Sequence, residues 1–343
     1  MKILLNTLYV MTPDRYLSLD GENVVISSEG KAVGRVPLHN LERIMTFGYT
    51  GASPALMGKC VSEGIELVFM KPNGHFLARV EGEINGNVVL RRQQYRIADD
   101  RKKSLEIAKI MISGKIFNGK QSVERTIRDY GLRIDTELFK SKSGFLKTSI
   151  QNALEAVSAD ELRGIEGEAA SVYFSVFDDM ILQQGEDFQF TVRNKRPPKD
   201  NVNAMLSFAY SLATGMCCSA LESVGLDPYV GFFHTDRPGR CSLALDLVEE
   251  FRVPLCDRFV LNLINKKMIT GKDFVHREDG AVILTDDGRK TFLQAWQKRK
   301  EEVITHPYLK EKVKWGIMPY VQALLLARYI RGDLDMYPVF MWK

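Results

Sequence analysis

The sequence predicts an α+β protein, with a small N-terminal β-sandwich or open-barrel domain over residues 1–85 and a larger all-helical C-terminal domain over residues 86–343. Two patterns support this prediction. Up to about residue 80, short stretches alternate between apolar and polar residues and are separated by turn residues. Beyond residues 85–87, apolar residues recur every three or four positions, which is typical of helices. The length of 343 residues is sufficient for two domains and at least one large core.

Strand and turn signals follow one another through the first domain. The strongest is Pro72-Asn73-Gly74, which lies between two β-rich stretches and predicts a hairpin. One helix is expected over residues 53–62, where it interrupts the strands. The expected strands cover residues 1–10, 16–19, 23–26, 32–37, 66–70 and 75–80.

Helical periods fill the second domain. A hairpin inserted near 275–285 is expected between two helices, because Glu278-Asp279-Gly280 has turn composition. The longest expected helix has a break near residues 141–144. The expected helices cover residues 99–118, 121–157, 159–183, 200–223, 243–251, 254–266, 286–303 and 316–331.

Composition excludes several classes of protein. No run approaches the roughly eighteen apolar residues of a membrane span, so no membrane contact is expected. The N-terminus is not followed by a small-residue cleavage site, which favours a first strand over a signal peptide. Five cysteines without CxxC spacing argue against a disulfide framework and a structural zinc site, and favour reduced thiols in a cytoplasmic protein. The net charge of +4 is too weak to imply nucleic acid, but residues 88–150 hold fifteen Lys and Arg against seven Asp and Glu.

One carboxylate lies on the apolar side of a predicted helix. Ser158 and Glu161 form a capping box, and Leu162 begins an apolar stripe at three- and four-residue spacing. Glu166 falls inside that stripe, where a carboxylate is costly unless it is paired or bound to a metal. Pairing with a buried Arg or Lys would satisfy Glu166 equally well.

A second group of candidate residues follows the phrase GFFH at residues 231–234. His234 precedes a polar loop that carries Arg237 and Arg240, and a short amphipathic helix then brings Asp246, Glu249 and Glu250 to one side. Each of these features also has a plain structural interpretation. The acids would then form a solvated face, the histidine would be hydrogen-bonded in the core, and the arginines would lie in a solvated loop.

Considered together, these side chains have a common chemistry. Two carboxylates and an imidazole suit Mg²⁺ or Mn²⁺ with open positions for water and phosphate, and the imidazole favours Mn²⁺. Such a site polarises a phosphoryl oxygen and lowers the pKa of a bound hydroxyl. Arg237 and Arg240 flank the histidine in sequence and would hold phosphates.

These segments resemble the CRISPR-associated spacer integrases of the Cas-one family, over nearly the whole chain. The opening, LLNTLYVMTPDRYLSLDGENVV, is most similar to the subtype I-C branch. The matching phrases, in order behind a β domain, are LRGIEGEAA with Tyr173-Phe174, PPKD, VNAMLS, His234, DLVEEFR at residues 246–252 and Gln322-Ala323.

The resemblance implies roles for single residues. Glu166, His234 and Glu249 would bind the divalent metal, Asp246 would be a further ligand or a supporting group, and Glu250 would take no part. Tyr173 would pack near the site or hydrogen-bond a ligand and would be a further contact for nucleic acid, with a role as a tyrosine nucleophile as the alternative. Arg193, Lys195 and Arg196 would follow the phosphate backbone without reading bases.

The resemblance also implies an activity and partners. The 3′-hydroxyl of a double-stranded pre-spacer would attack a phosphodiester at the CRISPR repeat boundary, and a second attack would follow on the opposite strand. The protein would form a homodimer through the β domain, and two dimers would flank a dimer of the small Cas-two partner in a heterohexamer. Two alternatives stay open: a metal-dependent nuclease or branched-DNA resolvase without integration, and a non-enzymatic DNA-binding scaffold.

Overall fold

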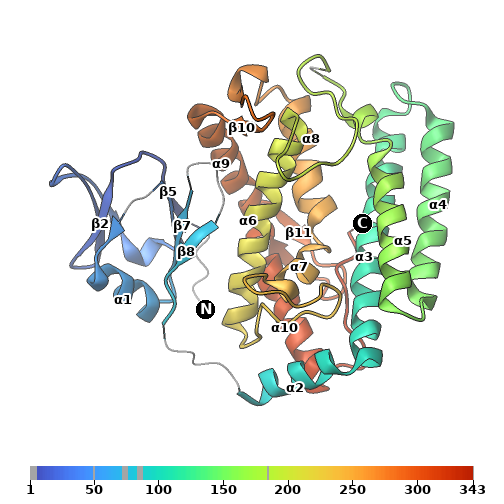
Figure 1. The fold of residues 1–343 in the computed structure, drawn as a ribbon, viewed down its shortest axis with the longest axis horizontal. Coiled ribbons are helices and arrows are strands. Elements are labelled where there is room, and N and C mark those ends of the chain that lie inside the picture. The colour runs from blue at the N-terminus through green and yellow to red at the C-terminus, as the bar shows by residue number, and fades with distance from the viewer. Residues whose placement is uncertain (1–5, 49–50, 72–75, 83–87, 184, 343) are drawn as a thin grey trace. The chain divides into compact units, whose positions relative to one another are not determined.

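The computed structural model of the chain describes residues 6–48, 51–71, 76–82, 88–183 and 185–342. The chain forms two compact units, which are described separately (Figure 1). The first comprises Met1–Asn85 with Leu284–Glu301, and the second comprises Gly86–Ile283 with Glu302–Lys343.

Two four-stranded sheets form the first unit. One sheet has the order β4-β3-β2-β6, in which β2, β3 and β4 make an antiparallel meander and β6 pairs with β2 in parallel. The other has the order β1-β5-β7-β8, in which β1, β5 and β7 are parallel and β8 is antiparallel to β7. The strands are β1 (Thr7–Val10), β2 (Tyr16–Asp20), β3 (Asn23–Ser28), β4 (Lys31–Pro37), β5 (Arg43–Phe47), β6 (Gly51–Ala52), β7 (Glu66–Met70) and β8 (Phe76–Arg79).

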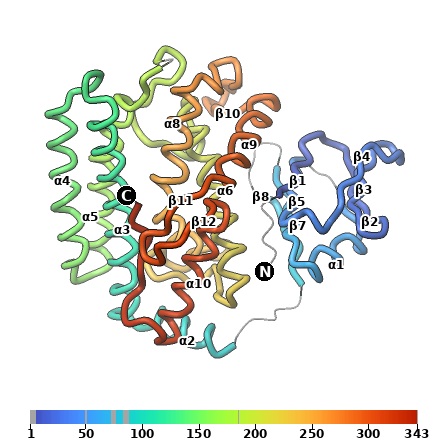
Figure 2. The backbone as a smooth tube through the Cα atoms, turned by 180° about the vertical axis from the view of Figure 1, so that it is seen from behind, coloured from blue at the N-terminus to red at the C-terminus, as the bar shows by residue number. Residues whose placement is uncertain are grey.

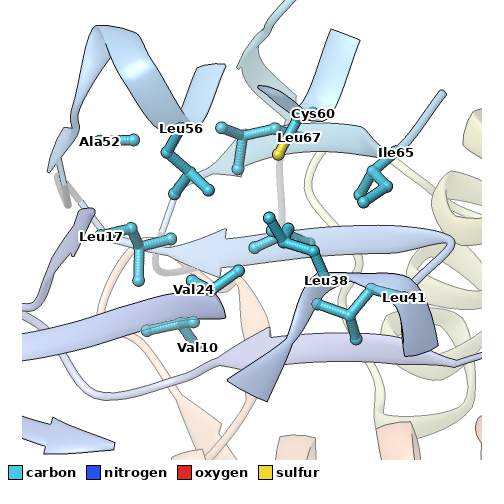
Figure 3. Packing of buried hydrophobic residues seen from close by; sticks show 11 residues of the cluster. Val10, Leu17, Val24, Leu38, Leu41, Ala52, Leu56, Cys60, Ile65 and Leu67 are labelled. Carbon is cyan, nitrogen blue, oxygen red and sulfur yellow. The ribbon is translucent and has the colours of Figure 1, made fainter. Parts of the chain in front are cut away.

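The core of this unit is formed by side chains from both sheets and from helix α1 (Pro54–Ser62) (Figure 3). Leu17, Val24 and Leu67 are fully buried there together with Leu56 of α1. The helix begins where the sequence predicts it, because the Ser53 hydroxyl accepts a hydrogen bond from the Leu56 amide at 3.2 Å.

The β prediction is confirmed in class, and the structure differs from the predicted organisation in two places. Strand β5 was not predicted, because its five residues are all buried and show no alternation. Helix α9 (Asp286–Glu301) belongs to the first unit, although its sequence position suggests the second. The predicted turn at residues 72–74 lies outside the described residues.

Helices make up most of the second unit (Figures 1 and 2). Helices α3, α4 and α5 pack side by side, and α6 packs against α7 and α10. A π-helical turn, Arg252–Asp257, leads directly into α8. The helices are α2 (Val88–Asp99), α3 (Arg101–Tyr130), α4 (Thr136–Glu155), α5 (Ala159–Phe174), α6 (Asn201–Ser223), α7 (Ser242–Val248), α8 (Arg258–Asn265) and α10 (Met318–Arg331).

This part of the chain is not entirely helical, so that detail of the prediction is wrong. Strands β9 (Phe274–His276) and β10 (Val282–Leu284) form a two-stranded sheet in the region where a hairpin was expected. Strands β11 (Val303–Thr305) and β12 (Lys312–Lys314) form a second one, which was not predicted because each strand has only three residues.

Several helix boundaries also differ from the predicted ones, and capping residues explain two of them. Asp100 caps α3 by accepting hydrogen bonds from the amides of Lys102 and Lys103, so α2 and α3 are separate helices. Asp135 caps α4 in the same way, which places the break at residues 131–135 and not near 141–144. Helix α5 ends at Phe174, nine residues before the predicted end at 183.

Of the described helices, α6 alone is long and apolar enough to cross a membrane by length and composition. Its apolar window is 67% buried inside the protein, as expected for a core helix. The Asp200 side chain caps this helix by accepting a hydrogen bond from the Asn203 amide at 2.7 Å.

Candidate functional site

Glu166 projects from the middle of α5. Ser158 caps this helix by accepting a hydrogen bond from the Glu161 amide at 3.2 Å, and the Glu161 carboxylate accepts from the Val157 amide at 2.8 Å. The cap fixes the helical register, so that Leu162 is buried and the Glu166 side chain one turn later is 21% exposed. Glu166 therefore lies at the border between core and surface, in reach of groups from both.

The three acids of the second candidate group are all buried. Asp246 lies in α7, and Glu249 and Glu250 follow directly after its last residue. Their burial excludes the interpretation as a solvated face. The three side chains point into different surroundings, and only Glu249 approaches Glu166 through a shared partner.

Asp246 holds the histidine loop in place. Its Oδ2 accepts hydrogen bonds from the amides of Phe232 and Phe233 at 2.6 and 3.0 Å, and its Oδ1 accepts from the His234 amide at 2.9 Å. The Oδ1 atom also lies 2.7 Å from His234 Nδ1. Both oxygens are thus fully engaged, so Asp246 orients the imidazole and is not placed as a further metal ligand.

Glycine at position 231 makes this arrangement possible. A Cβ atom there would lie 2.8 Å from Asp246 Oδ2 and 2.9 Å from the Ser242 carbonyl carbon. Any larger residue would push the loop away from α7. The close approach allows the loop amides to point at the carboxylate.

Lys115 of α3 joins Glu166 and Glu249. Its Nζ makes an ion pair with Glu166 Oε1 and lies 2.6 Å from Glu249 Oε2, and its side chain is only 13% exposed. His234 Nε2 lies 4.0 Å from Glu249 Oε1. The three predicted metal ligands, Glu166, His234 and Glu249, therefore converge from α5, the histidine loop and the end of α7.

The Lys115 ammonium group lies between two of the predicted metal ligands, Glu166 and Glu249. Within the described part of the chain, no three His, Cys, Asp or Glu side chains are arranged to hold a metal ion as they stand. The alternative interpretation of Glu166, pairing with a buried basic residue, corresponds to a contact that the structure contains. The metal assignment stays a prediction, and its donor set of two carboxylates and an imidazole with a free Nε2 fits Mn²⁺ or Mg²⁺.

Glu249 is held ionised by its neighbours. Burial alone would raise the pKa of this carboxyl, but the charges of Arg252, Lys115 and His234 lower it to about 2. Arg252 Nη2 lies 3.0 Å from Glu249 Oε1, three residues further along the chain. Sequence analysis missed Arg252, although its spacing of three from Glu249 is the spacing at which side chains meet on a helix.

Basic side chains gather next to Glu249. Arg193 and Arg252 both lie over the Tyr210 ring, at 5.2 and 5.0 Å from its centroid. Arg193 also donates hydrogen bonds to the side chains of Asn203 and Ser207, at 2.7 and 3.1 Å. Partial burial, together with Arg252 and Arg193, lowers the pKa of Lys195. The PPKD region thus brings positive charge to the acid site.

The other predicted DNA-contacting residues differ in exposure. Arg196 and Arg237 are exposed, and Arg240 is partly exposed at the end of the histidine loop. Tyr173 is 4% exposed and packs edge-on against Phe174 and Phe177. Its ring lies in the core beneath α5 and is not presented to nucleic acid.

Glu250 belongs to a separate buried cluster. Its carboxylate accepts hydrogen bonds from Gln322 Nε2, the Tyr337 hydroxyl and the Phe340 amide, at 2.6, 2.6 and 2.8 Å. Burial outweighs these bonds and raises its pKa to about 7. Glu250 therefore anchors the C-terminal segment through contacts that it does not share with Glu166.

Comparison with known proteins shows the family to which this chain belongs. The sequence model of the family described as "CRISPR associated protein Cas1" matches residues 8–298. The chain is 48% identical to CRISPR-associated endonuclease Cas1 1 of Chlorobaculum tepidum over 343 residues, which cover all of both chains.

Solved structures share the fold. A casposase bound to its integration product superposes with a TM-score of 0.83 at 22% identity, covering 97% of this chain and 94% of that one. A chain of a Cas6-RT-Cas1–Cas2 complex superposes with a TM-score of 0.80 at 20% identity, covering 98% of this chain and 36% of that one. Identities this low establish the shared fold alone.

Proposed function

The chain belongs to the Cas1 family of CRISPR-associated proteins, and from that premise we propose that it is a metal-dependent DNA endonuclease and integrase that inserts pre-spacer DNA into a CRISPR array. The convergence of Glu166, His234 and Glu249 carries this proposal. A non-enzymatic scaffold would have no need to place a buried carboxylate, a half-buried one and an oriented imidazole beside one another.

Glu166, His234 and Glu249 would hold the divalent cation. When bound, the ion would polarise the attacked phosphodiester and make the attacking hydroxyl more acidic. Asp246 accepts a hydrogen bond from His234 Nδ1, which leaves Nε2 on the side of Glu249. Arg252 keeps Glu249 charged at neutral pH, so the carboxylate is ready as a ligand.

The reaction on DNA is a transesterification. The pre-spacer 3′-oxygen forms a bond to phosphorus, and the bond between that phosphorus and the 3′-oxygen of the repeat strand breaks. The attacking hydroxyl loses its proton to solvent, and the leaving oxygen gains one. Tyr173 is buried and is not placed to act as a nucleophile, and direct attack by the 3′-hydroxyl requires no covalent enzyme intermediate.

Basic residues around the acids would hold the DNA backbone. Arg193, Lys195 and Arg252 lie next to Glu249, and Arg237 and Arg240 extend the positive charge along the histidine loop. Arg196, which is exposed beside them, would add a further phosphate contact. Such contacts neutralise phosphates without reading sequence.

We extend the proposal to assembly on the basis of family membership. The protein would act in the cytoplasm as a homodimer formed through the β unit, and two dimers would flank a dimer of a Cas2 protein in a heterohexamer. Within the family, we assign the chain to subtype I-C on the basis of its opening sequence.

A half-site integration assay tests the function. Wild-type protein with the Cas2 partner, Mn²⁺ and a labelled duplex with free 3′ ends should give strand-transfer products, and Glu166→Ala should give none while still binding DNA. Hydrolysis products alone would favour the nuclease or resolvase alternative. Full activity of both Glu166→Ala and His234→Ala would refute the proposed site.

A further inference from the structure

We propose that Lys115 is the built-in counter-ion of the acid site and that a divalent cation binds only by displacing its ammonium group. This inference rests on the proposed metal site and adds a residue that competes for it. Lys115 would thereby set the affinity of the protein for the ion.

The lysine and the metal need the same oxygen atoms. Glu249 Oε1 is held by Arg252 at 3.0 Å, so Oε2 is the oxygen left for a metal. This Oε2 is buried and makes no hydrogen bond of good geometry, and its close contact is the Lys115 Nζ at 2.6 Å. On the opposite side, Lys115 Nζ pairs with Glu166 Oε1. The ammonium group contacts both carboxylates, so a divalent cation held by Glu166 and Glu249 would compete with it.

The position of Lys115 is fixed by the packing of α3. Asn118, three residues along that helix, donates hydrogen bonds from Nδ2 to the carbonyls of Glu250 and Phe340, both at 2.9 Å. The glycine preceding Lys115, Gly114, leaves room for Val339, which would lie 2.3 Å from a Cβ at that position. These contacts tie the α3 backbone to the residue that follows Glu249, so the lysine is held opposite the acids by the fold.

Charge explains why the two cations exclude each other. In the metal-free protein, two carboxylates at close range would repel one another unless a positive charge lies between them. Lys115 supplies that charge. A divalent ion supplies it as well, and the ammonium would then face a like charge in a poorly solvated site. The lysine has a flexible four-carbon stem and can swing away, whereas Glu249 stays paired with Arg252.

Mn²⁺ titration calorimetry of the full chain tests the inference. Removing the ammonium in Lys115→Met should tighten Mn²⁺ binding by about tenfold, within the range of ordinary coupling between two binding events. Without metal, the variant should also have a lower melting temperature than the wild type, and Mn²⁺ should raise that temperature more in the variant. Lys120→Met is the matched control, because Lys120 pairs with Glu124 at 2.6 Å on the same helix; its Mn²⁺ affinity should equal that of the wild type.

Wild-type protein offers a second readout that no folding defect can affect. Mn²⁺ should raise the rate at which an amine-acetylating reagent modifies Lys115, measured by mass spectrometry with Lys120 as the internal reference. Equal or weaker Mn²⁺ binding by Lys115→Met, or unchanged acetylation, would overturn the inference alone. A wild type that binds no Mn²⁺, or a Glu166→Gln variant that binds it normally, would overturn the metal site and this inference with it.

Discussion

Asp246 shows how one buried carboxylate can determine the geometry of a site without entering it. Four donors converge on its two oxygens, three from the loop backbone and one from the His234 ring. The direction of the imidazole is therefore set by α7, the same helix that leads to Glu249. At the scale of single residues, supporting a ligand and being one are separate roles, and the contacts of Asp246 are those of a supporting group.

Replacing this carboxylate should weaken metal binding. In Asp246→Asn, an NH₂ group must face donors that need an acceptor, so at least one amide or the ring loses its partner. We expect Mn²⁺ affinity to fall by roughly 10–100-fold, the usual effect of changing the group that orients a metal-binding histidine. Titration calorimetry measures the Mn²⁺ affinity. The control is Asp236→Asn, a substitution at an exposed position in the same loop. Wild-type affinity in Asp246→Asn would contradict the assigned role.

Glu250 should make stability depend on pH. Its pKa rises from 4.5 when unfolded to about 7 when folded, so the folded state binds the proton more tightly. The stabilisation is fully present below pH 4.5 and is lost as the pH rises through about 7, a change of roughly 3 kcal/mol. Urea unfolding at several pH values should show this loss in the wild type and a smaller one in Glu250→Gln.

Two controls make the comparison of wild type with Glu250→Gln specific to Glu250. Asp257, whose pKa burial raises to about 6, contributes the same trend to both proteins, so the difference between them isolates Glu250. Glu168→Gln, an exposed change on α5, should behave like the wild type. Identical pH profiles of wild type and Glu250→Gln would show that folding does not raise the pKa of Glu250.

At the scale of elements, α3 connects the C-terminal segment to the site. Asn118 binds the backbone of both Glu250 and Phe340 and also accepts a hydrogen bond from the Trp342 amide at 2.7 Å. The tail of the chain is thereby packed against the helix that carries Lys115. Changes in this contact should alter stability and the acid site together.

A pair of glycine substitutions tests the packing of α3. Gly144 in α4 has open space around it, so Gly144→Ala should stabilise the protein by about 1 kcal/mol through helix propensity. Gly114→Ala would gain the same propensity but places a Cβ 2.3 Å from Val339, so we expect a net loss of roughly 1–3 kcal/mol. Urea unfolding compares the two variants. A Gly114→Ala protein as stable as Gly144→Ala would show that the tail does not pack closely there.

At the scale of the whole molecule, local patterns predicted the class of the fold and part of the site. The strand–turn alternation indicated the β unit, and Glu166 stood out because a carboxylate interrupts an apolar stripe. Lys115 gave a similar signal, lying between the buried residues Ile112 and Ile116, and it could have been singled out for the same reason.

Other features depend on contacts that no local pattern contains. Lys115 contacts Glu166, which lies 51 positions away in the sequence, and Asn118 contacts Glu250, which lies 132 positions away. Strand β5 and the grouping of α9 with the β unit are likewise decided by tertiary packing. Periodicity identifies which side chains are unusual, whereas only the folded chain determines which of them meet.

The most direct test of the account is the anomalous difference map of a crystal soaked in Mn²⁺. We expect one strong peak about 2 Å from an oxygen of Glu166, Nε2 of His234 and Oε2 of Glu249, with the Lys115 ammonium displaced from between the acids. A peak at another place, or no peak where these three side chains meet, would contradict the proposed site.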